Sequence, residues 1–125
     1  SQLFARIELV DTGQMLRRAD QATWRDPETG LVRRSLSVPG RGLMELVWIV
    51  FPAGAQVEYP AESYDVIADQ QIVVMDGELT LETDGRSDTL RVGDAYRFGP
   101  RRAVTFRNRG RVDCVYLVAV LREAR

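Results

Sequence analysis

Short apolar runs separated by glycine-containing turns are the feature that most constrains the fold of this chain. Such runs recur about every 8–12 residues over most of its length. The turns that close them are Pro52-Ala53-Gly54, Asp76-Gly77, Asp84-Gly85, Gly93-Asp94 and Asn108-Arg109-Gly110. Strands of this length with tight turns pack as antiparallel sandwiches or barrels. We therefore predict an all-β fold.

Three of these runs define their strands most clearly. Residues 43–51 are apolar at both parities, which predicts a strand that is covered on both faces. Residues 79–83 alternate apolar and polar side chains up to Asp84-Gly85, a strong signal for a tight hairpin. The last strand, residues 112–121, carries on one parity Cys114, Tyr116, Val118 and Val120. We expect Cys114 to act there as a small apolar core residue.

The N-terminal third of the chain differs from this pattern. The spacing of Leu3, Phe4 and Ile7 predicts a helix over residues 1–10. Residues 23–42 contain two turns around one predicted strand, residues 31–37. We expect this segment to be an arm that packs on the sheet and not a linker.

Two residue types are absent from the sequence, and their absence limits the reactions that the chain can catalyse. The chain contains no histidine, and all 17 of its basic residues are arginine. Without histidine it lacks the usual general base, the common nucleophile triads and the commonest metal ligand. Without lysine it can form no Schiff base and no phosphate-loop lysine contact. These absences favour a binding module over an enzyme.

The length and net charge of the chain limit the kinds of partner that it is expected to bind. A length of 125 residues corresponds to one domain, and the net charge of −1 gives no broad attraction to DNA or to an anionic membrane. The apolar run of residues 46–52 is too short to cross a bilayer. A single cysteine cannot form an internal disulfide, so we expect a cytoplasmic location and no membrane partner.

Two motifs follow one another between Phe51 and Asn108. The first opens with the turn that ends at Gly54 and closes with the run QQIVVMDGEL over residues 70–79. The second runs from Gly93-Asp94 to the segment TFRN over residues 105–108. In order and spacing, these motifs resemble the pair that marks the cupin family. The resemblance implies a jelly-roll barrel, also called a double-stranded β-helix, with a short N-terminal helix or arm.

Compared with metal-bearing cupins, this sequence lacks the residues of the metal centre. In those cupins, histidines and a glutamate of the first motif hold the metal together with a histidine of the second. Here the glutamate position falls on Gln70 and the second-motif histidine on Val104. The first-motif histidines would fall within residues 63–66, none of which is a histidine. Valine cannot coordinate a metal, and a neutral amide replaces a carboxylate poorly. We expect no metal and no cofactor.

Shorter segments carry a closer resemblance. The segments are WRDPETG over residues 24–30, RRSLS over 33–37, QQI over 70–72 and FRN over 106–108. They resemble the C-terminal cupin of bacterial XRE-type regulators, in which a helix-turn-helix domain precedes a cupin that senses a small effector. The resemblance implies that residues 1–12 end a linker or helix from a preceding DNA-binding domain and that residues 13–125 form the cupin domain. One departure is Asp69, where such regulators often carry a histidine.

The candidate ligand-binding residues follow from the two former metal positions. If Gln70 and Val104 face inward, period-two alternation turns Ile72 and Phe106 inward as well. Tyr96 joins them from a neighbouring strand, and Tyr64 and Trp48 complete the set. Together these side chains would form an apolar, aromatic pocket with one amide, suited to an apolar or planar small molecule. A packed core that contains Gln70 is an equally good interpretation of the same pattern.

The sequence also contains one acidic and one arginine-rich cluster that could bind ligands. The carboxylates before Gln70, namely Glu58, Glu62, Asp65 and Asp69, could bind a hard cation, but no calcium-loop pattern is present and we expect them to be solvated. The arginines around the second motif are Arg101, Arg102, Arg107, Arg109 and Arg111. Arginine forks suit an acidic effector, whereas the plainer expectation is a solvated rim paired with nearby acids.

The residues themselves predict an all-β binding module, and the resemblance implies a metal-free cupin that senses an unknown small-molecule effector and forms a homodimer within a bacterial transcriptional regulator. DNA would be bound only by a separate helix-turn-helix domain that this chain lacks. Two alternatives stay open: a metal-independent cupin isomerase or lyase, and a purely structural dimerisation domain with a filled interior. The enzyme would need a tyrosine and a carboxylate that converge in the pocket, such as Tyr64 or Tyr96 with Glu58 or Asp65.

Overall fold

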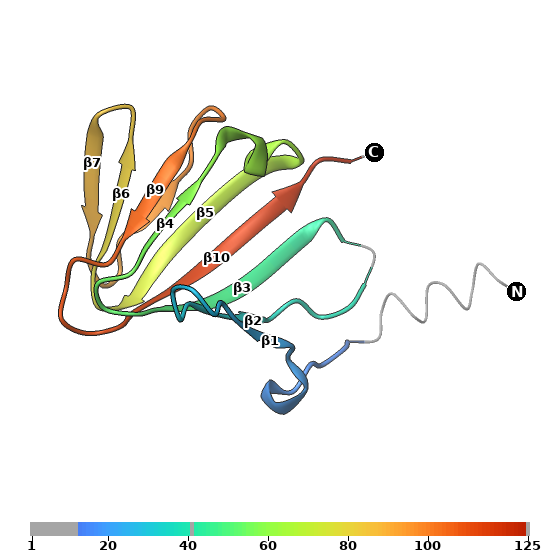
Figure 1. Cartoon of the computed structure of the whole chain (residues 1–125). Coiled ribbons are helices and arrows are strands. Elements are labelled where there is room, and N and C mark those ends of the chain that lie inside the picture. The colour runs from blue at the N-terminus through green and yellow to red at the C-terminus, as the bar shows by residue number, and fades with distance from the viewer. Residues whose placement is uncertain (1–12, 41, 125) are drawn as a thin grey trace, which may run out of the picture.

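The computed structural model describes residues 13–40 and 42–124, which form two antiparallel sheets and two short 3-10 helices (Figure 1). The larger sheet has the order β1 (Thr23–Arg25), β2 (Val32–Ser35), β3 (Met44–Phe51), β10 (Cys114–Arg122), β5 (Ile67–Asp76) and β8 (Ala95–Arg97). The smaller sheet has the order β4 (Gln56–Tyr59), β9 (Val104–Arg107), β6 (Leu79–Thr83) and β7 (Arg86–Leu90). The 3-10 helices are η1 (Arg18–Asp20) and η2 (Ala61–Tyr64). The predicted all-β fold is confirmed.

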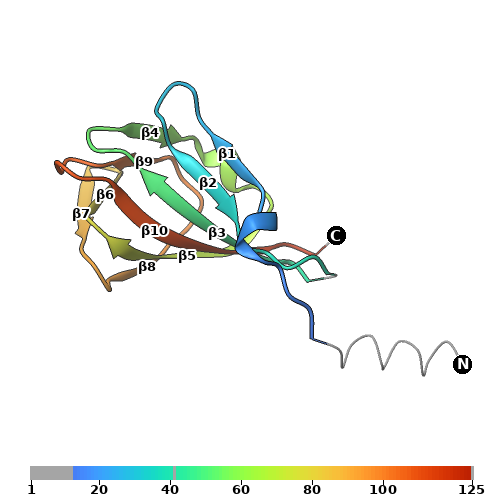
Figure 2. The ribbon, with the colours of Figure 1, turned by 90° about the horizontal axis from the view of Figure 1, so that it is seen from below.

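The core lies between the two sheets, which face each other around a shared interior (Figure 2). Alternation along each strand supplies it, because every second side chain of a strand points to the same face. β10 contributes the four residues of its predicted inward parity, and all of them are buried: Cys114, Tyr116, Val118 and Val120. From the facing sheet, Leu79, Leu81 and Phe106 are each at most 3 % exposed.

The tight hairpin predicted at Asp84-Gly85 is confirmed. β6 and β7 pair in register from Leu79 opposite Leu90 to Thr83 opposite Arg86. Both turn residues have positive φ, 49° for Asp84 and 76° for Gly85, as a two-residue hairpin with matching twist requires. The turn lies at the upper end of the molecule in Figure 1, beside η2 and the loop that follows β8.

A single asparagine ties the two sheets together at the opposite end. The Asn108 Nδ2 donates hydrogen bonds to the carbonyl oxygens of Phe51, at 3.0 Å, and Val112, at 2.9 Å. Its Oδ1 accepts from the backbone N–H of Gly110 at 2.9 Å. Because Asn108 is 2 % exposed, these three contacts replace water for a buried amide and fix the turn between β9 and β10.

Two predictions about the larger sheet need correction. β3 is buried on one face only: Val47, Ile49 and Phe51 face the core, whereas Trp48 on the other parity is half-buried. Among the described residues, neither sheet covers the outer face of β3. The segment of residues 23–42 holds two strands where one was predicted, since β1 pairs with β2 across the Asp26–Gly30 turn. β2 in turn pairs with β3, so the segment does pack on the sheet as expected.

The predicted helix over residues 1–10 and the linker over residues 1–12 lie outside the described residues, so the domain division stays a prediction. In the part of the chain that the structure describes, no helix has the length and apolar character needed to span a membrane.

Candidate ligand-binding cavity

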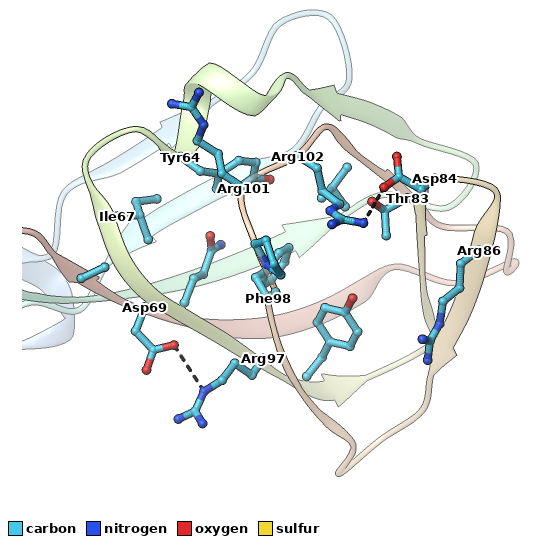
Figure 3. A pocket seen from close by; sticks show the side chains of 16 residues that line it. Tyr64, Ile67, Asp69, Thr83, Asp84, Arg86, Arg97, Phe98, Arg101 and Arg102 are labelled. Carbon is cyan, nitrogen blue, oxygen red and sulfur yellow. Dashed lines mark hydrogen bonds and ion pairs between the residues drawn. The ribbon is translucent and has the colours of Figure 1, made fainter.

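A cavity of about 570 Å³ opens at the end of the two sheets where η2 and the β6–β7 turn lie. Its walls come from the end of η2, the first residues of β5, the β6–β7 turn, β8 with the loop after it, and the first residue of β9. Both sheets and the loops at this end contribute side chains to the lining (Figure 3). Its size lies within the range of small-molecule sites.

Four of the predicted site residues line this cavity. They are Tyr64, Gln70, Tyr96 and Val104. Gln70 comes from β5 in the larger sheet and Val104 from β9 in the smaller one, so the two former metal positions do converge on one space. Val104 is 5 % exposed and supplies an apolar surface to the cavity.

Phe106 and Ile72 face the interior without lining this cavity. Phe106, 3 % exposed, borders a second cavity of about 340 Å³, which shares Tyr64, Ile67 and Gln70 with the first. These three shared side chains therefore separate two adjacent spaces. Ile72 is 2 % exposed and packs in the core below Gln70 on the same face of β5.

Trp48 lies apart from the other predicted residues. It belongs to the outward parity of β3, and the Arg34 guanidinium sits over its ring at 5.5 Å from the centroid. It borders a shallow depression on the outer face of the larger sheet, together with Val50. The predicted set therefore has to be corrected at this position, because a period-two strand cannot place Trp48 on the same face as Val47 and Ile49.

An aromatic cluster that the sequence reasoning assigned only in part forms one wall of the cavity. Phe98 stacks on Tyr64 with ring centroids 6.0 Å apart and on Phe106 with centroids 5.9 Å apart. Tyr96 meets Phe98 edge-on, at 5.2 Å and an interplanar angle of 88°. Phe98 was missing from the predicted set, although its spacing of two from Tyr96 was the signal that could have added it.

Two buried polar atoms in the lining have no partner. The Oε1 of Gln70 and the Oγ1 of Thr83 are both inaccessible to solvent, and neither makes a hydrogen bond within the described residues. An unsatisfied buried group costs about 1–3 kcal/mol, which native proteins usually avoid. A bound molecule that carries N–H or O–H groups would remove this cost. Nothing in the sequence pattern pointed to Thr83.

The rim of the cavity is charged and internally paired. Its lining holds four arginines and two aspartates, a formal charge of 4 − 2 = +2. Arg97 pairs with Asp69 at 3.3 Å, Arg102 with Asp84 at 2.5 Å, and Arg101 with Asp65 just outside the lining. Figure 3 shows Arg102 and Asp84 joined across the mouth. The expected pairing of the arginine rim with nearby acids is confirmed for Arg101 and Arg102.

The second-motif arginines farther along β9 pair in the same way. Arg107 and Arg109 both contact Glu82, at 2.6 Å and 2.9 Å. Neither lines the cavity, so they stabilise the neighbouring strand surface and leave the mouth to Arg101 and Arg102.

Of the tyrosines whose pKa is shifted, Tyr64 lines the cavity, whereas Tyr59 and Tyr116 lie outside its lining. Burial raises the pKa of Tyr64 well above its ordinary value, and it raises the pKa of Tyr59 and, more strongly, that of Tyr116. The carboxylates proposed as acid–base partners do not converge with them: neither Glu58 nor Asp65 lines the cavity. The pairings predicted with Glu58 or Asp65 are therefore not formed in the cavity, whose two lining carboxylates are Asp69 and Asp84.

The lining does not fit the metal that the jelly-roll resemblance implies. An amide at Gln70, an isopropyl group at Val104 and a phenol at Tyr64 offer no anionic or imidazole donor. Nowhere within residues 13–40 and 42–124 do three or more histidine, cysteine or acidic side chains come together in a way that could hold a metal ion.

The similarity of this chain to known proteins lies in its three-dimensional structure. No protein-family model and no curated protein sequence matches the chain. Among solved structures, the Cupin_2 domain of an XRE family transcriptional regulator from Enterobacter cloacae matches with a TM-score of 0.65 and 22 % identity, covering 76 % of this chain and 98 % of that one.

Other matches have different contexts. An HTH_3 family transcriptional regulator from Vibrio cholerae matches with a TM-score of 0.64 and 19 % identity over 79 % of this chain and 55 % of its own. KdgF from a Halomonas species matches with a TM-score of 0.64 and 19 % identity over 90 % of this chain and 96 % of its own. On the basis of these matches and of its two antiparallel sheets, the chain has the cupin fold.

Proposed function

We propose that this cupin binds a small organic molecule without a metal ion and serves as the effector-sensing domain of a bacterial transcriptional regulator. The observation that carries the proposal is the cavity of about 570 Å³ between the sheet ends, with the unpartnered Gln70 carbonyl in its wall. A binding role needs a shaped, partly apolar space with a few placed polar groups, and no reactive group. Matches to cupin domains of regulators support the regulatory context.

Sensing would operate through a change in populations. The cavity is built from loops of both sheets, so a molecule that fits one spacing of the sheet ends better than another favours that spacing. In a homodimer this shift would change the distance between attached DNA-binding domains, which alone would contact DNA. The proposed dimer would also cover the strands left at the sheet edges, β1 and β8 in the larger sheet and β4 and β7 in the smaller. We place such a regulator in the cytoplasm.

Native mass spectrometry combined with metal analysis tests the proposal. The samples are the protein as purified from cells and the same protein incubated with the small-molecule fraction of a bacterial lysate. A matched variant, Val104→Trp, places a large side chain in the cavity, while Arg91→Gln changes an exposed arginine outside it. We expect a dimer with a stoichiometric small-molecule adduct on the wild type and on Arg91→Gln, no adduct on Val104→Trp, and no metal.

Three results would contradict the proposal. A stoichiometric metal would return the metal-dependent chemistry of other cupins. An adduct that Val104→Trp retains would place binding outside the cavity. The absence of any adduct from both samples would support the structural dimerisation domain instead.

A further inference from the structure

The cavity wall selects for a flat ring. Tyr96 and Phe98 form a corner in which the two ring planes are nearly perpendicular, at 88°. Because Phe98 already stacks on Tyr64 and on Phe106, a planar ring placed in this corner stacks on Tyr96 and meets the edge of Phe98, the two arrangements that aromatic pairs favour. Val104 adds an apolar contact from the facing sheet. Phe98 lies at the centre of this wall in Figure 3.

The polar atoms in the wall select for a hydrogen-bond donor. The Gln70 Oε1 can only accept, and it is buried without a partner. The ligand must therefore offer an N–H or O–H group where its ring reaches Gln70. The unpartnered Thr83 hydroxyl provides a second contact that can donate or accept.

The mouth selects for negative charge. Of the four arginines in the lining, Arg102 has the least exposed side chain, 45 % against 55 % for Arg101, 67 % for Arg97 and 76 % for Arg86. Its Nη1 contacts the carboxylate of Asp84, an exposed residue on the β6–β7 turn. A guanidinium carries five N–H donors, so one contact does not exhaust it. Asp84 shows that a carboxylate reaches this position, and the formal charge of +2 in the lining disfavours a cationic ligand.

From these three features we infer that the cavity binds a planar aromatic carboxylate whose ring bears an N–H or O–H donor. The ring lies in the Tyr96–Phe98 corner, its donor meets the Gln70 carbonyl, and its carboxylate meets Arg102. This inference rests on the proposed function and names the chemical class of its ligand.

Isothermal titration calorimetry with four small compounds tests the assignment. Indole-3-carboxylate has all three features. Indole-3-carboxamide removes the charge, 1-methylindole-3-carboxylate removes the ring N–H, and cyclohexanecarboxylate removes the planar ring. We expect indole-3-carboxylate to bind and each of the other three to bind at least about tenfold more weakly, since each of them lacks one of the three contacts.

Variants assign each feature to its residue. Arg102→Gln should weaken the binding of indole-3-carboxylate at least about tenfold and leave the affinity for the carboxamide unchanged. Gln70→Leu should weaken the binding of indole-3-carboxylate and leave that of its 1-methyl analogue unchanged. Arg91→Gln, at an arginine that pairs with Glu78 at 3.4 Å outside the cavity, should change none of these affinities.

Equal binding of the acid and the carboxamide, or an acid preference that survives Arg102→Gln, would overturn the assigned ligand class. So would the failure of all four compounds to bind. If they fail while the wild type carries an adduct that Val104→Trp lacks, the ligand class is wrong and the binding function stands. If no adduct is found either, both are wrong.

Discussion

Gln70 is the residue at which stability and binding are expected to conflict. Its buried carbonyl has no partner, so replacing the amide with an apolar side chain removes an unsatisfied group. We predict that Gln70→Leu raises the free energy of unfolding by about 1 kcal/mol while ligand binding is weakened. Gln71→Leu is the matched control, because Gln71 is exposed on the opposite face of β5. Urea denaturation measures the free energy of unfolding of both variants. A Gln70→Leu variant less stable than the wild type would indicate that the amide has a structural partner.

Cys114 gives the molecule a pH dependence on the alkaline side. Burial, with the Asp76 carboxylate as a second cause, raises the pKa of this thiol from 9.0 to about 11. The unfolded chain loses the thiol proton near pH 9, whereas the folded chain keeps it until about pH 11. The free energy of unfolding should therefore fall over this window, by about 1.4 kcal/mol per pH unit. Denaturation midpoints of the wild type and of Cys114→Ala, measured against pH, report this fall in stability. Profiles that run parallel for the two proteins would contradict the assignment of the pH dependence to Cys114.

Asn108 should be among the most sensitive residues of the chain. Asn108→Ala removes three hydrogen bonds and leaves the carbonyls of Phe51 and Val112 without their donor, a cost of about 3 kcal/mol. Asn108→Asp keeps the shape and the acceptor for Gly110 but turns an oxygen toward those carbonyls, so at neutral pH it should cost more than alanine. Thermal unfolding compares the two variants, and a loss of under about 1 kcal/mol in both would show that the turn holds without this amide.

At the scale of elements, two glycines distinguish the cost of a left-handed backbone conformation from the cost of a steric clash. Gly77 and Gly93 both have positive φ, 72° and 89°. A Cβ on Gly77 would lie 2.7 Å from the Asp113 carbonyl oxygen and 3.1 Å from the Cα of Cys114, while one on Gly93 meets nothing within 4 Å. We predict a loss of about 1–2 kcal/mol for Gly93→Ala and at least about 1 kcal/mol more for Gly77→Ala. Equal losses, measured by denaturation, would mean that the approach of β5 to β10 tolerates a methyl group.

The strands that local signals define were predictable, and those that depend on a neighbour were not. The β6–β7 hairpin follows from alternation and the Asp84-Gly85 turn, and the inward parity of β10 follows from its sequence. β1 was missed because Thr23–Arg25 is exposed throughout and is a strand only through pairing with β2. The half-exposed outer face of β3 was also missed, because an apolar pattern does not reveal whether another layer covers it.

At the scale of the whole molecule, the same distinction applies to the cavity. The cupin resemblance placed Gln70 and Val104 in the interior with Tyr96 beside them, and the structure brings all three to the cavity, whereas Ile72 and Phe106, which period-two alternation added, face the interior outside it. The sequence could not decide between a pocket and a packed core. That difference depends on how far the β6–β7 turn and the loop after β8 hold the sheet ends apart, which is a property of tertiary packing and not of any one strand.

The central claim is that this space can be entered, and cysteine accessibility tests it most directly. Val104 and Cys114 are both buried, at 5 % and 0 % exposed, but only Val104 lines the cavity. We would measure the alkylation rate of Val104→Cys in a Cys114→Ala background with a small thiol reagent at pH 8, beside Cys114 in the wild type. We predict that the thiol introduced by Val104→Cys reacts while the protein stays folded, at least about a hundredfold faster than Cys114, which reacts only on unfolding. Equal protection of the two thiols would show a packed core and would contradict the account.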